Sequence, residues 1–236
     1  MKAIAIKIKI NPFGALQNIV HLLVKTLDNI SSRYAPSRIL TFNSAHIFKT
    51  LQLIENEGMV SRNILSRELR LGEGSIKTLI KHLKMEDMIR TTNRGTKMSD
   101  KGKSILNKLS AYIGHETNVP ECSISIGKFN HAILLKQMKC EISSGIEQRD
   151  IAIKNGAKGA ITLTFENEQF LTVNTNYDSL QNETGIKKLL VNKLNPIEND
   201  IIIIGSDDSN YIIAELAAKA AALHTLYNHD KHSYGP

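Results

Sequence analysis

Apolar residues recur at helical spacing between residues 43 and 85 and predict three helices in close succession. The first is expected over 45–56 with Ser44 as its N-cap, and the second over 62–70. The third, over 75–85, carries apolar side chains at relative positions 0, 3, 4 and 7, namely Ile76, Leu79, Ile80 and Leu83. This spacing places the four side chains on one buried face of the helix.

The pattern changes after residue 87 and predicts a β-hairpin followed by a fourth helix. Two β-prone runs, 88–92 and 96–99, flank the turn residues Asn93-Arg94-Gly95. Ser99 is then expected to cap a helix that begins at Asp100, with inward side chains at Ile105, Leu106 and Leu109. Helix, helix, turn, helix, hairpin and helix is the element order of the winged helix-turn-helix.

Residues 60–84 and 89–102 resemble the winged helices of prokaryotic transcription regulators. Many of these end the wing with Leu-Thr-x-x-Gly, and residues 98–102, Met-Ser-Asp-Lys-Gly, stand in that place here. The resemblance implies the fold more specifically than it implies DNA binding, because winged helices also serve as interaction modules. A protein- or RNA-interaction module therefore stays open as an alternative.

The C-terminal half alternates β-rich and helical segments and predicts a two-layer α/β domain over residues 121–228, after a linker at 116–120. Strands are expected over 122–126, 131–137, 161–165, 170–173 and 201–204, the last buried on both faces. Helices are expected over 145–155, 185–194 and 210–227, and residues 205–209 are expected to form a turn. The predicted fold class is α+β, a winged helix-turn-helix domain at 31–115 followed by this domain.

Together the two halves resemble an archaeal family of two-domain, winged-helix regulator-like proteins whose C-terminal α+β domain has no assigned function. The matching C-terminal stretches are 145–160 and 200–208, and the resemblance covers about residues 31–226. It implies a transcription regulator with a sensing or dimerising domain, and it supplies no ligand. Residues 1–30 fall outside it, and we expect an arm there, with a strand at 3–10 and a helix at 15–27, that folds, dimerises or stays loose.

The charge distribution favours a polyanionic partner. The net charge is +7, but residues 1–119 hold 19 Lys and Arg against 9 Asp and Glu, whereas residues 120–236 hold 11 against 14. A basic half joined to a slightly acidic half is typical of a nucleic-acid binder coupled to another module. No window approaches the ~18 apolar residues of a membrane span, so we expect no membrane partner.

The cysteines and histidines point to no metal or disulfide chemistry. Cys122 and Cys140 are the two cysteines, and their spacing gives neither a disulfide framework nor a zinc site. We therefore expect buried, inert thiols and a cytoplasmic protein. Three histidines cluster near the C-terminus, His224, His229 and His232, and we interpret residues 229–236 as a polar tail.

The candidate DNA-binding residues lie on the predicted recognition helix and the elements beside it. The N-terminal half of a recognition helix faces base edges, where Lys, Ser and Thr side chains can bond bases or phosphates. An Arg at the start of the second helix suits a phosphate, and one at the wing tip suits a narrow minor groove. The predicted set is Arg62, Ser75, Lys77, Thr78, Lys81, His82, Arg94 and Lys97.

Two weaker candidates for a ligand site lie in the C-terminal half. In helix 145–155, Ile146, Ala152 and Ile153 are expected to form the buried side, which places the charges of Arg149 and Asp150 beside it. Either the two charges form an internal network or, with Gln148, they line a ligand site. In the turn after strand 201–204, Ser206, Asp207 and Asp208 either cap the next helix or bind a hydroxylated ligand or a cation.

The sequence thus predicts a DNA-binding transcription regulator that needs no cofactor and is not an enzyme. Its predicted partners are double-stranded DNA, a small-molecule effector and a second copy of the chain. The homodimer is expected through the C-terminal half, because strand 201–204 needs cover and the Ala-rich helix permits close approach. A small enzyme with its site in the C-terminal domain is a further alternative.

Overall fold

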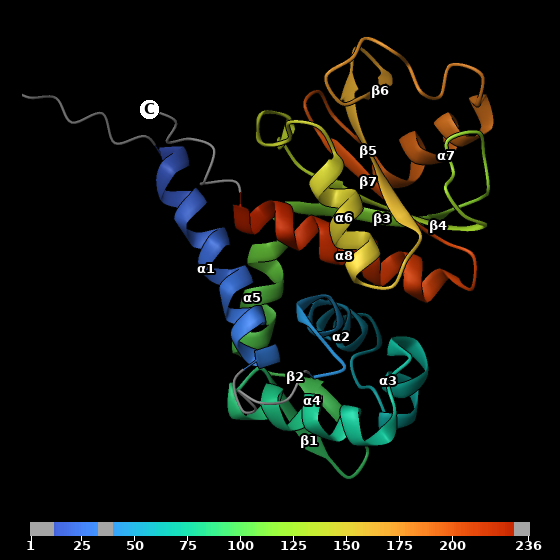
Figure 1. Cartoon of the computed structure of the whole chain (residues 1–236). Coiled ribbons are helices and arrows are strands. Elements are labelled where there is room, and N and C mark those ends of the chain that lie inside the picture. Colours follow the sequence, from blue (N-terminus) through green and yellow to red (C-terminus); the bar gives the residue numbers. More distant parts are fainter. Residues whose placement is uncertain (1–11, 33–39, 229–236) are drawn as a thin grey trace, which may run out of the picture.

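The computed structural model describes residues 12–32 and 40–228, and it confirms the two-part α+β arrangement (Figure 1). The predicted strand at 3–10 and the tail at 229–236 lie outside the described residues. The N-terminal half consists of α1 (Pro12–Ser32), α2 (Ser44–Glu57), α3 (Arg62–Leu69), α4 (Glu73–Met85), β1 (Ile89–Thr92), β2 (Gly95–Met98) and α5 (Asp100–Leu109). From α2 to α5 this is the winged helix-turn-helix order.

Side-chain caps set where these helices begin. Ser61 caps α3 and Ser99 caps α5, each hydroxyl accepting a backbone N–H three residues on, and the Ser99 cap was predicted. The predicted Ser44 cap is wrong, because Asn43 caps α2. The Asn43 side chain accepts the N–H of Ala45 at 3.1 Å, and Nδ1 of His46 accepts the N–H of Asn43 at 3.3 Å. This is a capping box with histidine in the position that Glu or Gln usually occupies.

The wing is tied to the turn between α2 and α3. β1 and β2 pair antiparallel, with Thr91 opposite Thr96 and Arg90 opposite Lys97. Val60 then bridges to Thr96 through two backbone hydrogen bonds of 2.9 and 2.8 Å. The hairpin is therefore held at a fixed place beside the start of α3.

The C-terminal half is built on a five-stranded antiparallel sheet. The order is β3 (Ile113–Val119), β4 (Phe129–Leu135), β7 (Ile201–Asp207), β5 (Gly159–Glu166) and β6 (Gln169–Thr172). β7 is the central strand, and all seven of its residues are buried. This confirms the prediction that its Ile run is covered on both faces.

Helices cover both faces of the sheet. Ile201 and Ile203 face α6 (Ile146–Lys154) and α8 (Tyr211–Asn228), whereas Ile202 and Ile204 face α7 (Thr184–Leu194). A single 3-10 turn, Lys139–Glu141, follows β4. The alternation follows from the strand geometry, in which successive side chains point to opposite faces.

Four local predictions for this half are wrong. Residues 116–120, expected as a linker, lie mostly within the edge strand β3, and residues 122–126, expected as a strand, form a loop. Residues 205–207, expected as a turn, continue β7. The thiol of Cys140 is exposed rather than buried, and that of Cys122 is half-buried.

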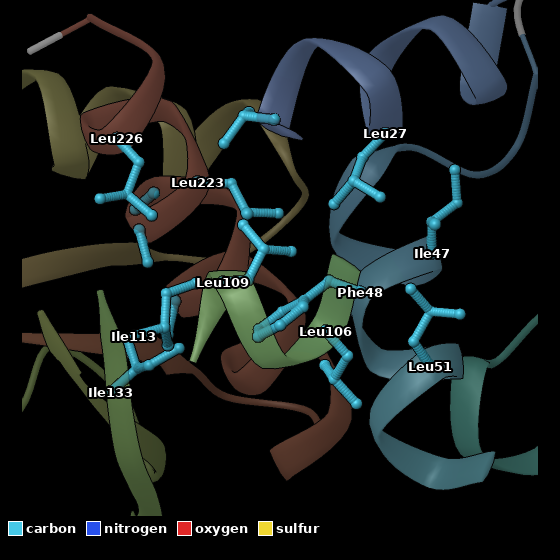
Figure 2. Packing of buried hydrophobic residues seen from close by; sticks show 14 of the residues in the cluster. Leu27, Ile47, Phe48, Leu51, Leu106, Leu109, Ile113, Ile133, Leu223 and Leu226 are labelled. Carbon is cyan, nitrogen blue, oxygen red and sulfur yellow. The ribbon is translucent and has the colours of Figure 1, made fainter. Parts of the chain in front are cut away.

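The two halves share one apolar core. A continuous cluster of buried side chains joins α1, α2 and α5 to β3, β4 and α8 (Figure 2). Figure 2 shows Phe48 of α2 and Leu109 of α5 in this cluster together with Ile133 of β4 and Leu223 of α8. The halves are therefore not independent bodies joined by a tether.

The shared core also uses the surfaces on which the predicted homodimer depends. α8 lies on β7 and is covered by α1, α2 and α6, and both faces of the Ile201–Ile204 run are covered within the chain. Neither is available as a dimer contact. Among the described helices, none has the length and apolar character needed to cross a bilayer.

Candidate nucleic-acid interface

A hollow lies between the exposed face of α4, the start of α3 and strand β1. Its lining residues are Arg62, Lys77, Ile80, Lys81, Lys84, Met85 and Thr91. Lys77, Lys81 and Lys84 are spaced at i, i+4 and i+7, so they share one face of α4. The start of α3 places Arg62 across from them.

A second hollow adjoins the first and extends to the tip of the wing. It is lined by residues 61–63 and 91–96, and it shares Arg62 and Thr91 with the first. We call the two together the basic groove, whose cations are Arg62, Lys77, Lys81, Lys84 and Arg94. No acidic residue lines either hollow in the part of the chain that the structure describes.

One carboxylate stands at the edge of the basic groove. Glu73 Oε1 lies 2.9 Å from Lys77 Nζ, one turn along α4. The hydrogen bond from Lys77 and its positive charge lower the pKa of Glu73. Both side chains are more than half exposed, and a surface pair of this kind exchanges partners at little cost. Lys77 can therefore leave Glu73 for a phosphate or a base.

Two predicted hydroxyls lie at the start of α4 and hold local hydrogen bonds. Thr41 donates to Ser75 Oγ at 2.6 Å, and Thr78 donates to the Gly74 carbonyl at 3.0 Å. Ser75 is not the cap of the helix, because α4 begins two residues earlier with Gly72 in the cap position.

Four of the predicted DNA-binding residues do not line the basic groove, namely Ser75, Thr78, His82 and Lys97. His82 is buried, since its Nδ1–H donates to the Ile30 carbonyl at 2.8 Å and its ring meets Phe42 edge-on at 5.8 Å. Helix α1 covers that flank of α4, so the prediction for His82 is wrong. Lys97 pairs across the hairpin with Arg90 and is in neither hollow.

The structure adds Lys84 and Thr91 to the predicted set. Lys84 could have been found from its i+7 spacing to Lys77 on the exposed face. Thr91 depends on the register of the hairpin, which opposes it to Thr96 and leaves it lining both hollows. The remaining predicted residues, Arg62, Lys77, Lys81 and Arg94, are brought together as expected.

The candidates on α6 are separated by the structure. Gln148 is buried and donates through Nε2 to Thr225 Oγ1 at 2.8 Å, whereas Arg149 and Asp150 form an exposed ion pair at 3.0 Å. The predicted buried side is wrong, because Ile146 and Ile153 are each 50% exposed. The charges are solvated, so they carry no burial cost that a ligand would relieve.

The candidates after β7 are held by internal hydrogen bonds. Buried Ser206 donates to Asn130 Oδ1 at 2.6 Å, and Asp208 pairs with Lys158 at 2.6 Å. Asp207 Oδ1 accepts the N–H of Ser209 at 2.7 Å, just ahead of α8. The cap of α8 is Asn210, whose Oδ1 accepts the N–H of Ile213 at 3.1 Å, so the predicted cap is wrong, and Asp207 instead closes the turn that precedes Asn210.

A buried charge cluster joins α2 and α8 to the sheet. Glu116, His131 and Glu215 bring three ligand-type atoms within 4.8 Å of one another, as in a metal site. However, the fully buried Lys219 contacts Glu116, lies 3.3 Å from Glu215 and donates to Gln52 Oε1 at 2.7 Å. The ammonium group therefore already supplies the cation, and the cluster is structural. Lys49 adds a second pair with Glu215 at 2.6 Å.

Comparison with known proteins finds likeness in both halves. A family model described as "PH0730-like, N-terminal domain" matches residues 47–104, and a "Domain of unknown function (DUF4443)" matches residues 126–226. The solved structure of hypothetical protein PH0730 from Pyrococcus horikoshii OT3 is similar at 25% identity with a TM-score of 0.62. The match covers 83% of this chain and 96% of that one.

This chain therefore resembles a hypothetical archaeal protein along most of its length. The first family match spans most of α2 to α5, and the second spans the sheet from β4 to α8. A search of curated proteins finds no match. The resemblance to an archaeal family that the sequence predicted is therefore confirmed at the level of similarity to a hypothetical archaeal protein.

Proposed function

We propose that this chain binds duplex DNA through the basic groove and acts as a transcription regulator. The observation that carries the proposal is the convergence of five cations from α3, α4 and the wing on one groove with no acidic lining. Helix α4 has the diameter that the major groove of B-DNA admits. Placed there, it presents Lys77 and Lys81 to base edges and phosphates.

The elements beside α4 suit the phosphate backbone. Arg62 lies in the first turn of α3, where backbone N–H groups are unsatisfied and the helix dipole favours an anion. Arg94 is exposed at the hairpin turn, from which an Arg can enter the adjacent minor groove. This division gives positioning contacts from α3 and the wing, and base readout from α4.

The test uses the full chain and fluorescent duplexes selected from a random library. If about five phosphates are neutralised, the slope of log affinity against log salt is about −4 to −5. Binding to an equivalent RNA duplex is expected to be much weaker, because the deep, narrow major groove of A-form RNA excludes a helix. Salt-independent binding, or equal affinity for RNA, would refute the proposal, and the second result would favour the RNA-module alternative.

Variants on α3 and α4 distinguish contacts made by the basic groove from the effect of positive charge elsewhere on the surface. Arg62→Ala should weaken binding to all sequences alike and reduce the salt slope by about one. Arg67→Ala is the matched control, because its side chain is 72% exposed on the same helix and lines neither hollow. Lys77→Ala should instead reduce sequence preference by about 1–3 kcal/mol if Lys77 reads a base. An equal loss in Arg67→Ala and Arg62→Ala would contradict the assigned groove.

A further inference from the structure

Helix α6 leaves one of its faces uncovered. It packs on α8 and β5, with Gln148 and Ala152 buried on that side. Figure 1 shows α6 lying across the outer side of α8. The opposite face carries four side chains that are each about half exposed, and we call them the α6 stripe: Ile146, Arg149, Asp150 and Ile153.

The α6 stripe has the pattern of a covered helix face. Its members stand at relative positions 0, 3, 4 and 7, which places them within an arc of about 100°. One exposed Ile is ordinary on a protein surface. Two on the same stripe, seven residues apart, are typical of a face on which another helix packs. No element of the described chain covers them.

The charges of the α6 stripe lie on either side of its apolar line. In helical projection, Arg149 stands about 50° to one side of the line through Ile146 and Ile153, and Asp150 stands about 50° to the other side. The two are adjacent in the sequence, so they lie at nearly the same height along the helix. They form an exposed ion pair within the chain, and such a pair exchanges partners at little cost.

This arrangement is complementary to a second copy of itself. A two-fold axis parallel to the helix sets Ile146 and Ile153 against the same residues of the partner and exchanges the two sides of the stripe. Arg149 of each copy then faces Asp150 of the other, on both sides of the apolar line. An antiparallel pair would oppose Arg149 to Arg149 and Asp150 to Asp150, so the charges favour the parallel contact.

We propose that the α6 stripe binds the same stripe of a second copy in a parallel, two-fold contact, which makes the chain a homodimer. The contact differs from the one predicted from the sequence, because β7 and α8 are covered within the chain. One short helix from each copy gives an interface smaller than the about 1,200 Å² of standard stable complexes. The dimer is therefore weak and depends on protein concentration. The proposal does not rest on DNA binding.

Sedimentation velocity of the full chain at low salt, from about 1 to about 500 μM, measures the contact. We expect the sedimentation coefficient to rise from that of a monomer to that of a dimer across this range. Arg149→Asp and Asp150→Arg each oppose like charges across the axis, so each should weaken dimerisation at least tenfold. Arg67→Asp is the matched control, because Arg67 belongs to an ion pair of adjacent residues on α3 and is well exposed. It should leave the dimer unchanged.

Mixing the two charge variants tests the pairing itself. When Arg149→Asp and Asp150→Arg proteins are combined, two carboxylates of one chain face two guanidinium groups of the other. A mixed dimer should therefore form although each variant dimerises poorly alone, and high salt should weaken it. Absence of the mixed dimer would overturn the pairing of Arg149 with Asp150 across the axis.

Oxidative cross-linking of Ile153→Cys tests the direction of the two helices. In the parallel contact the two introduced thiols face each other, and diamide should link them in a disulfide that peptide mapping identifies. In an antiparallel contact they lie about 10 Å apart along the helix direction, which is too far for a disulfide. A chain that dimerises without this link would overturn the parallel contact.

The apolar line is tested with Ile153→Ser, which should weaken dimerisation at least tenfold. Leu22→Ser, at an exposed apolar position of α1, should not. All of these positions are exposed, so unfolding midpoints should match the wild type and establish that each variant folds. A chain that stays monomeric at about 500 μM, or a dimer unaffected by Arg149→Asp and Ile153→Ser, would overturn the proposal.

Discussion

His46 makes folding sensitive to mild acid. Burial, with a further contribution from the charge of Lys49, lowers the pKa of His46 from 6.5 to about 4. Between these values the unfolded chain binds a proton that the folded chain does not, so stability falls as the pH drops from about 6.5 to about 4. The loss is up to about 3 kcal/mol.

Urea denaturation at pH 7.5 and pH 4.5 measures this effect. His46→Gln should flatten the pH dependence, whereas His115→Gln, at an exposed position of β3, should leave it as in the wild type. The ionisation of Glu116 does not contribute to the change in stability between pH 7.5 and pH 4.5. Burial opposes its ionisation, but Lys219 and His131 outweigh burial and lower its pKa to about 2, so its contribution to stability is lost only below about pH 4.5. An unchanged slope in His46→Gln would show that another group titrates there.

Single residues were predictable where the reason is local. The Ser99 cap and the exposed lysines of α4 follow from neighbours in sequence. The positions of His82 and Gln148 were not predictable, because α1 covers His82 and α8 covers Gln148. Each contact joins residues more than 50 positions apart in the sequence. Ile146 and Ile153 failed for the converse reason, since an apolar side chain is buried only if another element covers it.

At the scale of elements, the close packing of α8 on β7 depends on one glycine, Gly205. A Cβ added to Gly205 would lie 2.3 Å from the Ala214 carbonyl oxygen and 2.9 Å from the Ala218 nitrogen, both backbone atoms. Gly205→Ala must therefore move the helix off the strand, at a cost of about 1–3 kcal/mol or more.

Gly185 of α7 provides the matched control for Gly205. A Cβ there meets nothing within 4 Å, so Gly185→Ala should be neutral or stabilise by roughly 0.5–1 kcal/mol. Urea midpoints measure both variants. A Gly205→Ala protein as stable as the wild type would contradict the close approach.

The buried charge cluster should make Lys219 indispensable to the contact between α2 and α8. Lys219→Met leaves two carboxylates, Glu116 and Glu215, beside a single remaining ammonium from Lys49. Removing one partner of a buried pair costs about 3–5 kcal/mol. Lys193→Met, an exposed position of α7, should change stability by less than about 0.5 kcal/mol. A loss below about 1 kcal/mol in Lys219→Met would show that the cluster contributes little, and thermal or urea unfolding decides.

Most helices and strands were predictable, and their partners were not. The periodicity of residues 76–83 and the turn at 93–95 are local signals that the structure confirms. The predicted linker failed because edge strand β3 is largely polar and half-exposed, so its pattern resembles a connection. The charge cluster joins Lys49, Glu116, Glu215 and Lys219, and only the i,i+4 spacing of Glu215 and Lys219 is visible in the sequence.

At the scale of the whole molecule, the shared core predicts a single cooperative unfolding transition. The cluster of buried side chains runs without a break from α1 through the winged helix into the sheet and α8. Near-ultraviolet circular dichroism of the tyrosines, most of them in the C-terminal half, and calorimetry should report one midpoint. Two separated transitions would contradict the shared core.

The candidate interface was predictable at this scale because charge is a property of composition. The excess of 10 positive charges in residues 1–119 is visible without a fold, and the structure gathers part of it in the basic groove. The shared core was not predictable, since the apolar faces of α2 and α8 show that each needs a cover without showing that each covers the other.

The contact between α2 and α8 has a consequence for synthesis of the chain. The ribosome makes the winged helix first, but the apolar side of α2 stays open until α8, the last described element, leaves the exit tunnel. A nascent chain that ends before residue 211 displays Phe48 and its neighbours to solvent and to chaperones. The half of the chain proposed to read DNA is thus made first, but the apolar core beneath it becomes complete only with the final helix.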